Sequence, residues 1–248
     1  MQMPNSLKTA TVIVPSIGRP CLRRCVASVL GQTRAAVNAY VVCDGPAFRS
    51  EVQAALDGLD TARIQLLNLP ENVGAGGYYG HRIFAGCSHF VNSEFVLFLD
   101  EDNWYEPEHI ESLIARITAH GLDWAFSLRR ICSAIGEFIA DDDCESLGPW
   151  PSWQNHHLVD TSSYCVKTAV AAAVASAWHG SGAQDRTYFA TLSKYFPRFA
   201  SSGRYTLNYC LGGNPGSVTA EFFLHGNEVM RQRHTGGLPW KATPLHTP

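Results

Sequence analysis

The sequence contains few charged residues and no cluster of basic ones. Of its 248 residues, 17% are Asp, Glu, Lys or Arg, and the formal net charge is −3. Proteins that bind a nucleic-acid backbone need a basic face, which this composition does not provide. Hydrophobic residues make up 46% of the chain, enough for one large domain with a sizeable core. We therefore expect a globular protein that does not bind nucleic acid.

The chain also lacks long apolar runs. Its longest apolar helical stretch, residues 166–178, contains Lys167 and is shorter than the ~18–20 residues that span a membrane. Residues 1–8 show no apolar signal region. These absences predict a cytoplasmic protein, and they leave open a peripheral contact with the inner face of a membrane.

Metal-binding cysteine pairs are missing as well. The eight cysteines are scattered. Cys21 and Cys25 share one face of a predicted helix, but no second Cys or His pair follows at zinc spacing. Scattered cysteines within predicted strands and helices are typical of buried, reduced thiols. We expect neither a zinc site nor a disulfide framework.

The first half of the chain alternates between strands and helices. Apolar runs predict strands at 11–14, 39–43, 64–69 and 95–99, and amphipathic or apolar stretches predict helices at 21–32, 51–59, 77–91 and 107–120. Alternation of this kind builds a parallel sheet with helices on its faces. The predicted fold class is therefore α/β, with a Rossmann-like, mostly parallel sheet.

The second half is less regular. Strands are predicted at 124–130, 137–140 and 205–210, helices at 166–178, 185–195 and 217–231, and a long polar loop at 141–157. Residues 236–248 contain three prolines and two glycines, which predicts an extended tail. We expect a single domain over residues 1–235 followed by this tail.

Three consecutive acids follow the most apolar of the predicted strands. Phe95–Leu99 reads as a buried parallel strand, and Asp100, Glu101 and Asp102 come directly after it. The carboxyl ends of parallel strands are where open α/β sheets bind ligands. Clustered carboxylates repel one another, and Mg²⁺ or Mn²⁺ relieves that repulsion. The three acids therefore form either a site for a metal and a diphosphate or a solvated acidic loop. A second acidic run, residues 141–143, is interpreted as a solvated loop.

Two further strand ends and one glycine-rich segment have the features of a nucleotide site. The first predicted strand runs into Pro15, Ser16 and Arg19, where a helix N-terminus offers free N–H groups. Asp44 ends the second strand and suits a pyrimidine N–H or a ribose hydroxyl, although Asp-Gly is also a common turn. Residues 72–80 bring backbone close to a ligand but match neither a dinucleotide fingerprint nor a Walker sequence.

One acid and two histidines are further candidates in the second half. Asp185 opens a predicted helix, where it is either a helix cap or a general base directed at the edge of the sheet. His225 and His234 are the candidates for additional metal ligands among ten histidines.

Taken together and in this order, the motifs resemble those of the GT-A fold and of its family 2 glycosyltransferases. The resemblance covers roughly residues 9–235. Asp100-Glu101-Asp102 is similar to the family's Asp-x-Asp metal motif, and Gln184-Asp185 to its Glu-Asp motif, with Gln in place of the first acid. The double glycine at 76–77, followed by Tyr78, is most similar to the galactofuranosyl- and rhamnosyltransferase-like branch. The Arg and Asn that often follow this segment are replaced here by residues 79–82.

The resemblance implies an inverting, metal-dependent transferase that moves a sugar from a nucleotide-diphosphate donor, expected to be a UDP-sugar, to a hydroxyl. The acceptor would be a glycan, a lipid-linked molecule or a small molecule. Residues 9–103 would form the nucleotide-sugar-binding half and residues 104–235 the acceptor and catalytic half. Alternatives with the same fold are a nucleotidyltransferase and a non-catalytic sugar or nucleotide binder.

The resemblance also implies roles for particular residues. Asp185 would be the general base, and Mn²⁺ or Mg²⁺ would be bound by Asp102 with Asp100 and His225. The nucleotide would contact Pro15, Ser16, Arg19, Asp44, Asn72, Gly74 and Asp100. Sugar or acceptor would contact Trp178, His179 and Trp153, and the loop at 141–157 would act as a lid.

Overall fold

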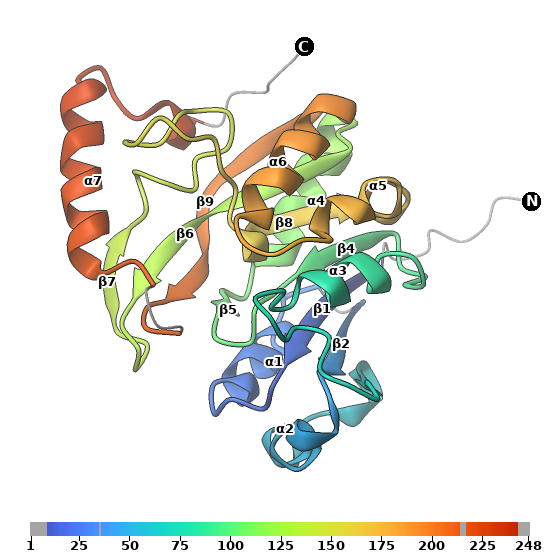
Figure 1. Ribbon diagram of the computed structural model, residues 1–248. Helices are drawn as coiled ribbons and strands as arrows, with labels where there is room; N and C mark the ends of the chain where they lie inside the picture. The colour runs from blue at the N-terminus through green and yellow to red at the C-terminus, as the bar shows by residue number, and fades with distance from the viewer. Residues whose placement is uncertain (1–8, 35, 214–216, 243–248) are drawn as a thin grey trace, which may run out of the picture.

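The computed structural model describes residues 9–34, 36–213 and 217–242. Within these residues, nine strands form one sheet (Figure 1). They are β1 (Ala10–Ser16), β2 (Val37–Cys43), β3 (Ile64–Asn68), β4 (Phe95–Phe98), β5 (Trp104–Tyr105), β6 (Trp124–Cys132), β7 (Phe138–Asp141), β8 (Tyr164–Lys167) and β9 (Phe199–Cys210). Their order across the sheet is β3-β2-β1-β4-β8-β6-β9-β5, and β7 pairs with β6.

Helices cover both faces of this sheet. The α-helices are α1 (Leu22–Leu30), α2 (Arg49–Leu56), α3 (His81–Cys87), α4 (His109–His120), α5 (Thr168–Ala173), α6 (Gln184–Tyr195) and α7 (Ala220–Arg233). Short 3₁₀ helices are η1 (Pro46–Phe48), η2 (Thr61–Arg63), η3 (Thr161–Ser163), η4 (Ala175–Trp178) and η5 (Pro239–Ala242). No helix within the described ranges has the length and apolar character needed to cross a membrane.

The first four long strands are parallel, as the alternating pattern predicts. β1 is buried along its whole length and lies between β2 and β4. Its register pairs Ser16 with Cys43 and Ile13 with Phe98. The residues that follow these strands therefore meet at one edge of the sheet, which brings the turn after β1, Asp44 and the three acids together.

The other half of the sheet is mixed rather than parallel. β8 is antiparallel to both β4 and β6, whereas β9 is parallel to β6. The predicted helix at 166–178 is wrong in its first part, because Tyr164–Lys167 forms the strand that joins the two halves. The rest of that stretch forms α5 and η4. Residues 164–166 are buried between two neighbouring strands, and this tertiary pairing overrides the helical preference of the alanines that follow.

Two hydrophobic clusters form the core, one on each face of the sheet. One face packs against α1, α2 and α4 through side chains such as Leu22, Val52 and Leu113. The other face packs against α3, α6 and α7 and contains most of the large aromatic side chains, among them Trp124 and Trp178. The eight cysteines are all free thiols, as expected.

The expectation of an extended tail from residue 236 is wrong for the part of it that folds into η5. Trp240 is fully buried there, and its Nε1 donates a hydrogen bond of 2.8 Å to Asp143 Oδ1. Lys241 forms an ion pair of 3.1 Å with the other oxygen of Asp143, and the Tyr205 hydroxyl donates to the same carboxylate. This segment belongs to the domain core. Residues 243–248 of the expected tail lie outside the described residues.

Candidate active site

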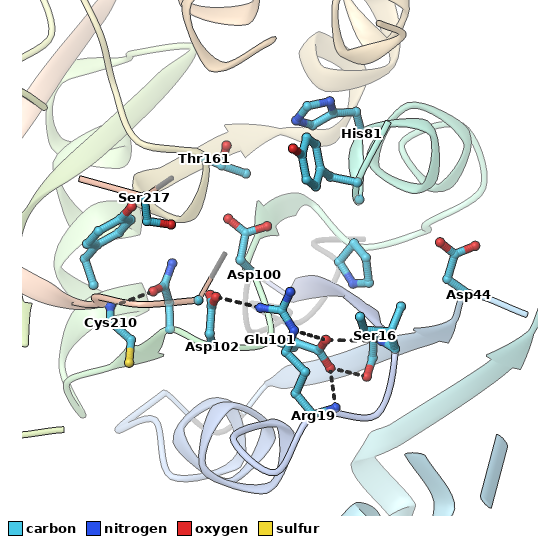
Figure 2. A pocket seen from close by; sticks show the side chains of 17 residues that line it. Ser16, Arg19, Asp44, His81, Asp100, Glu101, Asp102, Thr161, Cys210 and Ser217 are labelled. Carbon is cyan, nitrogen blue, oxygen red and sulfur yellow. Dashed lines mark hydrogen bonds and ion pairs between the residues drawn. The ribbon is translucent and has the colours of Figure 1, made fainter. Parts of the chain in front are cut away.

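A cavity of about 280 Å³ lies at the carboxyl ends of β1, β2 and β4 (Figure 2). Its wall is formed by the turn after β1, the end of β2, the glycine-rich segment, the acids after β4 and the end of β9. Six of the predicted site residues line it, namely Pro15, Ser16, Arg19, Asp44, Asp100 and Asp102. The alignment of parallel strand ends therefore gathers residues up to 87 positions apart in the sequence, from Pro15 to Asp102.

The middle acid of the three binds to the turn after β1. Glu101 is 7% exposed and accepts hydrogen bonds from Ser16 Oγ at 2.5 Å and from the Ile17 and Arg19 backbone N–H groups at 3.2 and 3.3 Å. Burial raises the pKa of Glu101, and these hydrogen bonds oppose that rise. Glu101 is thus an anchor that fixes β4 to the turn, and its neighbours Asp100 and Asp102 provide the carboxylates of the site.

Asp102 is paired with Arg19. Arg19 Nη1 lies 3.1 Å from Asp102 Oδ2, and the aspartate side chain is only 16% exposed (Figure 2). Burial raises the pKa of Asp102, and the charge of Arg19 opposes this. Burial and the neighbouring charges of Asp102, Asp160 and Asp185 raise the pKa of Asp100 well above its usual range. The site concentrates negative charge that one arginine only partly compensates.

These carboxylates fit a hard divalent cation that takes few ligands from the protein. Asp100 and Asp102 line one cavity, and crowding of buried negative charge is the condition that such a cation relieves. Within the ranges that the structure describes, no group of three or more His, Cys, Asp or Glu side chains is arranged to hold a metal ion. A cation here would complete its coordination with oxygens that are not protein ligands, as Mg²⁺ does when it is bound through phosphates.

Asp44 organises the glycine-rich segment. Its Oδ1 and Oδ2 accept hydrogen bonds from the backbone N–H groups of Val73 and Gly74 at 2.7 and 2.9 Å. Burial raises the pKa of Asp44, while these two hydrogen bonds lower it. Asp44 still lines the cavity, but Asn72 is exposed and is not among the lining residues. Gly74 is a part of the loop that Asp44 fixes, and it too lies outside the cavity wall.

The segment after these glycines brings two rings to the cavity. Gly80 packs against Pro15 so closely that an added Cβ would lie 2.7 Å from Pro15 Cγ. Tyr79 is 56% exposed and has a left-handed backbone, with φ of 49°. His81 has its Nδ1 at 3.0 Å from the Gly180 carbonyl, and burial lowers the pKa of this histidine. Tyr79 and His81 belong to the segment 79–82 that the sequence analysis singled out after the glycines.

A second cavity, of about 470 Å³, adjoins the first. Tyr79, Tyr209 and Ser217 line both cavities. The second cavity is also lined by Asp185, from the first turn of α6, and by four charged residues that the sequence analysis did not select, namely Arg129, Glu145, Asp160 and Arg186. The two cavities therefore share a wall, with the strand-end acids on one side and Asp185 on the other.

Arg129 is buried on β6 and forms ion pairs with three acids. Its Nε, Nη1 and Nη2 lie 2.7, 2.5 and 2.6 Å from carboxylate oxygens of Asp142, Asp160 and Glu145. Tyr209 covers the face of the guanidinium, with its ring centroid 4.4 Å from Cζ. Each guanidinium nitrogen thus has a carboxylate partner. Arg129 accordingly offers the cavity no unpaired guanidinium nitrogen, whereas Arg186, which is exposed, adds a cation to the same lining.

The interpretation of residues 141–143 as a solvated loop is wrong. Asp142 is fully buried, and its two oxygens accept hydrogen bonds from Arg129 and from the backbone N–H groups of Cys144, Glu145 and Ser146. Burial alone would raise the pKa of Asp142, but Arg129 and these hydrogen bonds hold it below its usual value. The acidic run therefore closes the loop after β7 and positions Glu145.

Asp185 is suited to accept a proton. It lines the second cavity in the first turn of α6, where its Oδ1 accepts the Arg186 backbone N–H at 2.8 Å. Burial, followed by the negative charge of Asp160, raises the pKa of Asp185. A carboxylate with a raised pKa binds a proton more readily, which is the property that a general base requires.

Several predicted contact residues lie away from both cavities. Trp178 is fully buried and stacks on Tyr188 with ring centroids 4.1 Å apart, so it belongs to the core and not to a sugar platform. Trp153 packs against Phe222 and His225, and His225 is exposed on α7. None of these residues lines either cavity, and the two proposed roles, sugar contact and metal ligand, do not fit their positions.

The other two histidines are also placed elsewhere. His179 lines a separate apolar cavity of about 310 Å³ between β2, β3 and α3, together with side chains such as Leu67 and Ile83. His234 packs against the ring of Trp240. The loop at 141–157 is held through Asp142 and by packing of Trp150 and Trp153 against η5 and α7, so its described contacts are those of a docked segment.

For one of the cavity-lining residues that were not selected, Arg129, the sequence did contain an indication. A charged residue inside a buried strand, such as Arg129 within residues 124–132, is rarely buried unless it is paired. Its partners lie 13, 16 and 31 positions away along the chain, and no spacing rule connects them. Tyr209 and Ser217 gave no signal of their own.

The mixed sheet with helices on both faces is an α/β fold of the GT-A type. The family described as Glycosyl transferase family 2 matches residues 11–161, more than half of the chain. The chain belongs to this family. A comparison with curated proteins found no match.

Solved structures of S. aureus TarS share the fold. TarS 1-349 in complex with UDP-GlcNAc matches 92% of this chain with 17% identity and a TM-score of 0.62. TarS 1-349 in complex with UDP matches 90% with 16% identity and a TM-score of 0.55. The longer TarS structure matches 92% with 18% identity and a TM-score of 0.57. The chain spans 66, 64 and 39% of these three solved chains, less than two thirds of each.

Proposed function

We propose that this protein transfers a sugar from a UDP-sugar to a hydroxyl group of an acceptor, with inversion at the anomeric carbon. The observation that carries this proposal is the shared wall between the two cavities. It sets Asp185 across from the strand-end acids, as a base and a leaving group must be set for attack from the opposite face. Family membership and the likeness to solved structures with UDP-GlcNAc or UDP support it.

The donor would occupy the first cavity. Ser16, Arg19 and Asp44 line it from the ends of β1 and β2, where nucleotides bind on sheets of this type. Asp44 also accepts two backbone hydrogen bonds, so its carboxylate is held in place before the nucleotide arrives. Such preorganisation lowers the entropic cost of binding. The carboxylate suits the N3–H of uracil.

Asp102, with Asp100, would hold a divalent cation, Mn²⁺ or Mg²⁺. When bound, the cation would supply electrostatic stabilisation for the negative charge that develops on the departing diphosphate. Glu101 would keep both carboxylates in register with the turn after β1 through its bonds to Ser16 and the backbone. This anchoring restricts movement of the acids relative to the nucleotide turn.

Asp185 would remove the proton from the acceptor hydroxyl as its oxygen attacks the anomeric carbon. The bond from that carbon to the diphosphate oxygen breaks in the same step, and no covalent enzyme intermediate is needed. Glu145 and Asp160 add hydrogen-bond acceptors to the second cavity, and every nitrogen of Arg129 is already paired. These acceptors suit the hydroxyl groups of a sugar-like acceptor, and Arg186 adds one cation to the same lining.

The proposal is tested by titrating UDP into the protein in a calorimeter, with and without Mn²⁺. We expect binding that strengthens with Mn²⁺, and loss of that strengthening in Asp102→Asn. Asp57→Asn is the matched control, because Asp57 is exposed at the end of α2 and lines neither cavity. Binding that is indifferent to Mn²⁺ and to Asp102→Asn would contradict the assigned role of Asp102.

Turnover then separates the enzyme from its alternatives. A donor screen begins with UDP-galactofuranose, because the Gly76-Gly77-Tyr78 segment resembles that branch of the family. Release of UDP from the UDP-sugar identifies glycosyl transfer, whereas release of pyrophosphate from UTP and a sugar 1-phosphate identifies nucleotidyl transfer. Asp185→Asn should lower kcat by about 10²- to 10⁴-fold with little change in UDP affinity. Failure of UDP and of other nucleoside diphosphates to bind would indicate a protein without this activity.

A further inference from the structure

Arg19 occupies the carboxylate that a cation would need. Its Nη1 lies 3.1 Å from Asp102 Oδ2, and its Nε lies 3.6 Å from Glu101 Oε1. The Arg19 side chain is 30% exposed and lines the first cavity (Figure 2). Gly213 closes over the same pair, since a Cβ added there would lie 2.2 Å from Asp102 Oδ2 and 3.5 Å from Arg19 Nη1. The ion pair is therefore enclosed on the protein side and open toward the cavity.

A guanidinium and a divalent cation compete for one carboxylate oxygen. Their charges have the same sign, and at a separation of a few ångströms in a partly buried site this repulsion is weakly screened. The guanidinium must therefore move before a cation binds Asp102 closely. If the guanidinium finds no new anionic partner, its positive charge is no longer neutralised after it leaves Asp102. The free energy of that loss weakens cation binding.

A diphosphate provides such a partner. Arg19 lies in the turn after β1, beside Ser16, on the wall where the proposed donor binds. Guanidinium groups bind phosphate oxygens in a bidentate fork that is stronger than a single contact to one carboxylate oxygen. A nucleoside diphosphate thus stabilises the position of Arg19 that leaves Asp102 free.

We propose that Arg19 excludes divalent cations from Asp102 until a nucleoside diphosphate draws its guanidinium away, so that cation and donor bind cooperatively. This inference rests on the proposed function for the location of the donor. Coupling between two ligands is reciprocal, so the factor by which UDP strengthens cation binding equals the factor by which the cation strengthens UDP binding. Arg19 is in this respect a positioning residue that acts through Asp102.

The test measures binding of Mn²⁺ itself, from the electron paramagnetic resonance signal of the free ion, with and without UDP. For the unaltered protein we expect weak Mn²⁺ binding that UDP strengthens by about tenfold or more. In Arg19→Gln, which keeps a polar side chain without charge, Mn²⁺ alone should bind about tenfold more tightly, and the strengthening by UDP should shrink. Arg19→Lys retains the charge and should retain weak binding of Mn²⁺ alone.

Two further variants fix the location and specificity of the effect. Arg23→Ala removes an exposed arginine of α1 whose Nη1 donates hydrogen bonds to the Ala55 and Asp57 carbonyls, and it should leave Mn²⁺ binding unchanged. Asp102→Asn should abolish the gain seen in Arg19→Gln when the two are combined. Thermal melting verifies that each variant is folded.

The outcomes for Arg19 and for the proposed function are distinguishable. Mn²⁺ affinity that is equal or lower in Arg19→Gln than in the unaltered protein overturns the inference, even if UDP binds normally. A gain that persists in the double variant with Asp102→Asn also overturns it, because the cation then binds elsewhere. Failure of UDP to bind any variant instead counts against the proposed function, while the effect of Arg19→Gln on Mn²⁺ alone still decides whether Arg19 blocks Asp102.

Discussion

Replacement of Arg129 by Met should strongly destabilise the protein. Arg129 is 3% exposed and compensates three carboxylates at 2.5 to 2.7 Å, one of which, Asp142, is fully buried. Met has a similar length and fills most of the same volume, but it cannot make the cation–π contact that places Arg129 Cζ 5.3 Å from the Phe223 ring centroid. The substitution thus removes the charge while it preserves most of the volume.

The expected cost is about 3–5 kcal/mol of unfolding free energy at neutral pH, which is the usual penalty for leaving a buried charge without its partner. Charge-assisted hydrogen bonds contribute about 1.5–3 kcal/mol each, and the desolvation of Arg129 itself offsets part of that sum. For a chain of this size the cost corresponds to a decrease in Tm of roughly 6–20 °C.

Urea unfolding followed by circular dichroism measures this cost, and Arg130→Met provides the matched control. Arg130 is the next residue on β6, is 39% exposed, and forms one ion pair of 2.8 Å with Glu106. Exposed pairs contribute about 0–1 kcal/mol, so this control should remain near the unaltered protein. Equal stabilities for the two variants would refute the reasoning.

The loss of unfolding free energy in Arg129→Met should depend on pH in a defined direction. In the unaltered protein Arg129 and backbone hydrogen bonds hold the pKa of Asp142 below its usual value despite burial, so its contribution is present above about pH 4 and lost at lower pH. Without Arg129, only the backbone hydrogen bonds from Cys144, Glu145 and Ser146 oppose burial, which then raises the pKa of Asp142 above the unfolded value. The deficit of Arg129→Met should therefore be smaller at pH 5 than at pH 7.5.

Two further substitutions test the packing of η5 and the geometry of the glycine-rich segment. Trp240→Ala removes a fully buried side chain from η5 and should cost about 3–5 kcal/mol in urea unfolding, a result that an undocked terminal segment would not give. Gly74→Ala would place a Cβ 2.3 Å from the Tyr79 carbonyl oxygen and 2.6 Å from Asp44 Oδ2, so UDP affinity in calorimetry should decrease by about tenfold or more. Gly86→Ala, where an added Cβ has no neighbour within 4 Å, should leave UDP affinity unchanged.

The strand-end side of the candidate site could be predicted because local patterns determine it. Buried parallel strands are short apolar runs, and the residues after β1, β2 and β4 meet wherever such strands are adjacent. Asp44 and Asp102 could be selected from position alone. The orientation of Glu101 could not, because it depends on hydrogen bonds to a turn more than 80 residues away.

The side of the candidate site that contains Asp185 was harder to predict because long-range contacts determine it. Val166 lies in an apolar stretch that reads as a helix, yet pairing with both β4 and β6 makes it part of a strand. Trp178 has the large flat ring that could stack on a sugar, but it packs inside an aromatic cluster. Arg129 meets its three partners only after the loop that follows β7 has folded back.

The wall shared by the two cavities has a consequence for chemical selectivity. Tyr79, Tyr209 and Ser217 border both cavities, so an acceptor hydroxyl and a water molecule would reach the sugar by the same route. Asp185 would deprotonate either one, since a general base does not distinguish two hydroxyl groups in the same position. The ratio of productive transfer to wasteful hydrolysis would then depend on how completely the acceptor displaces water from the larger cavity.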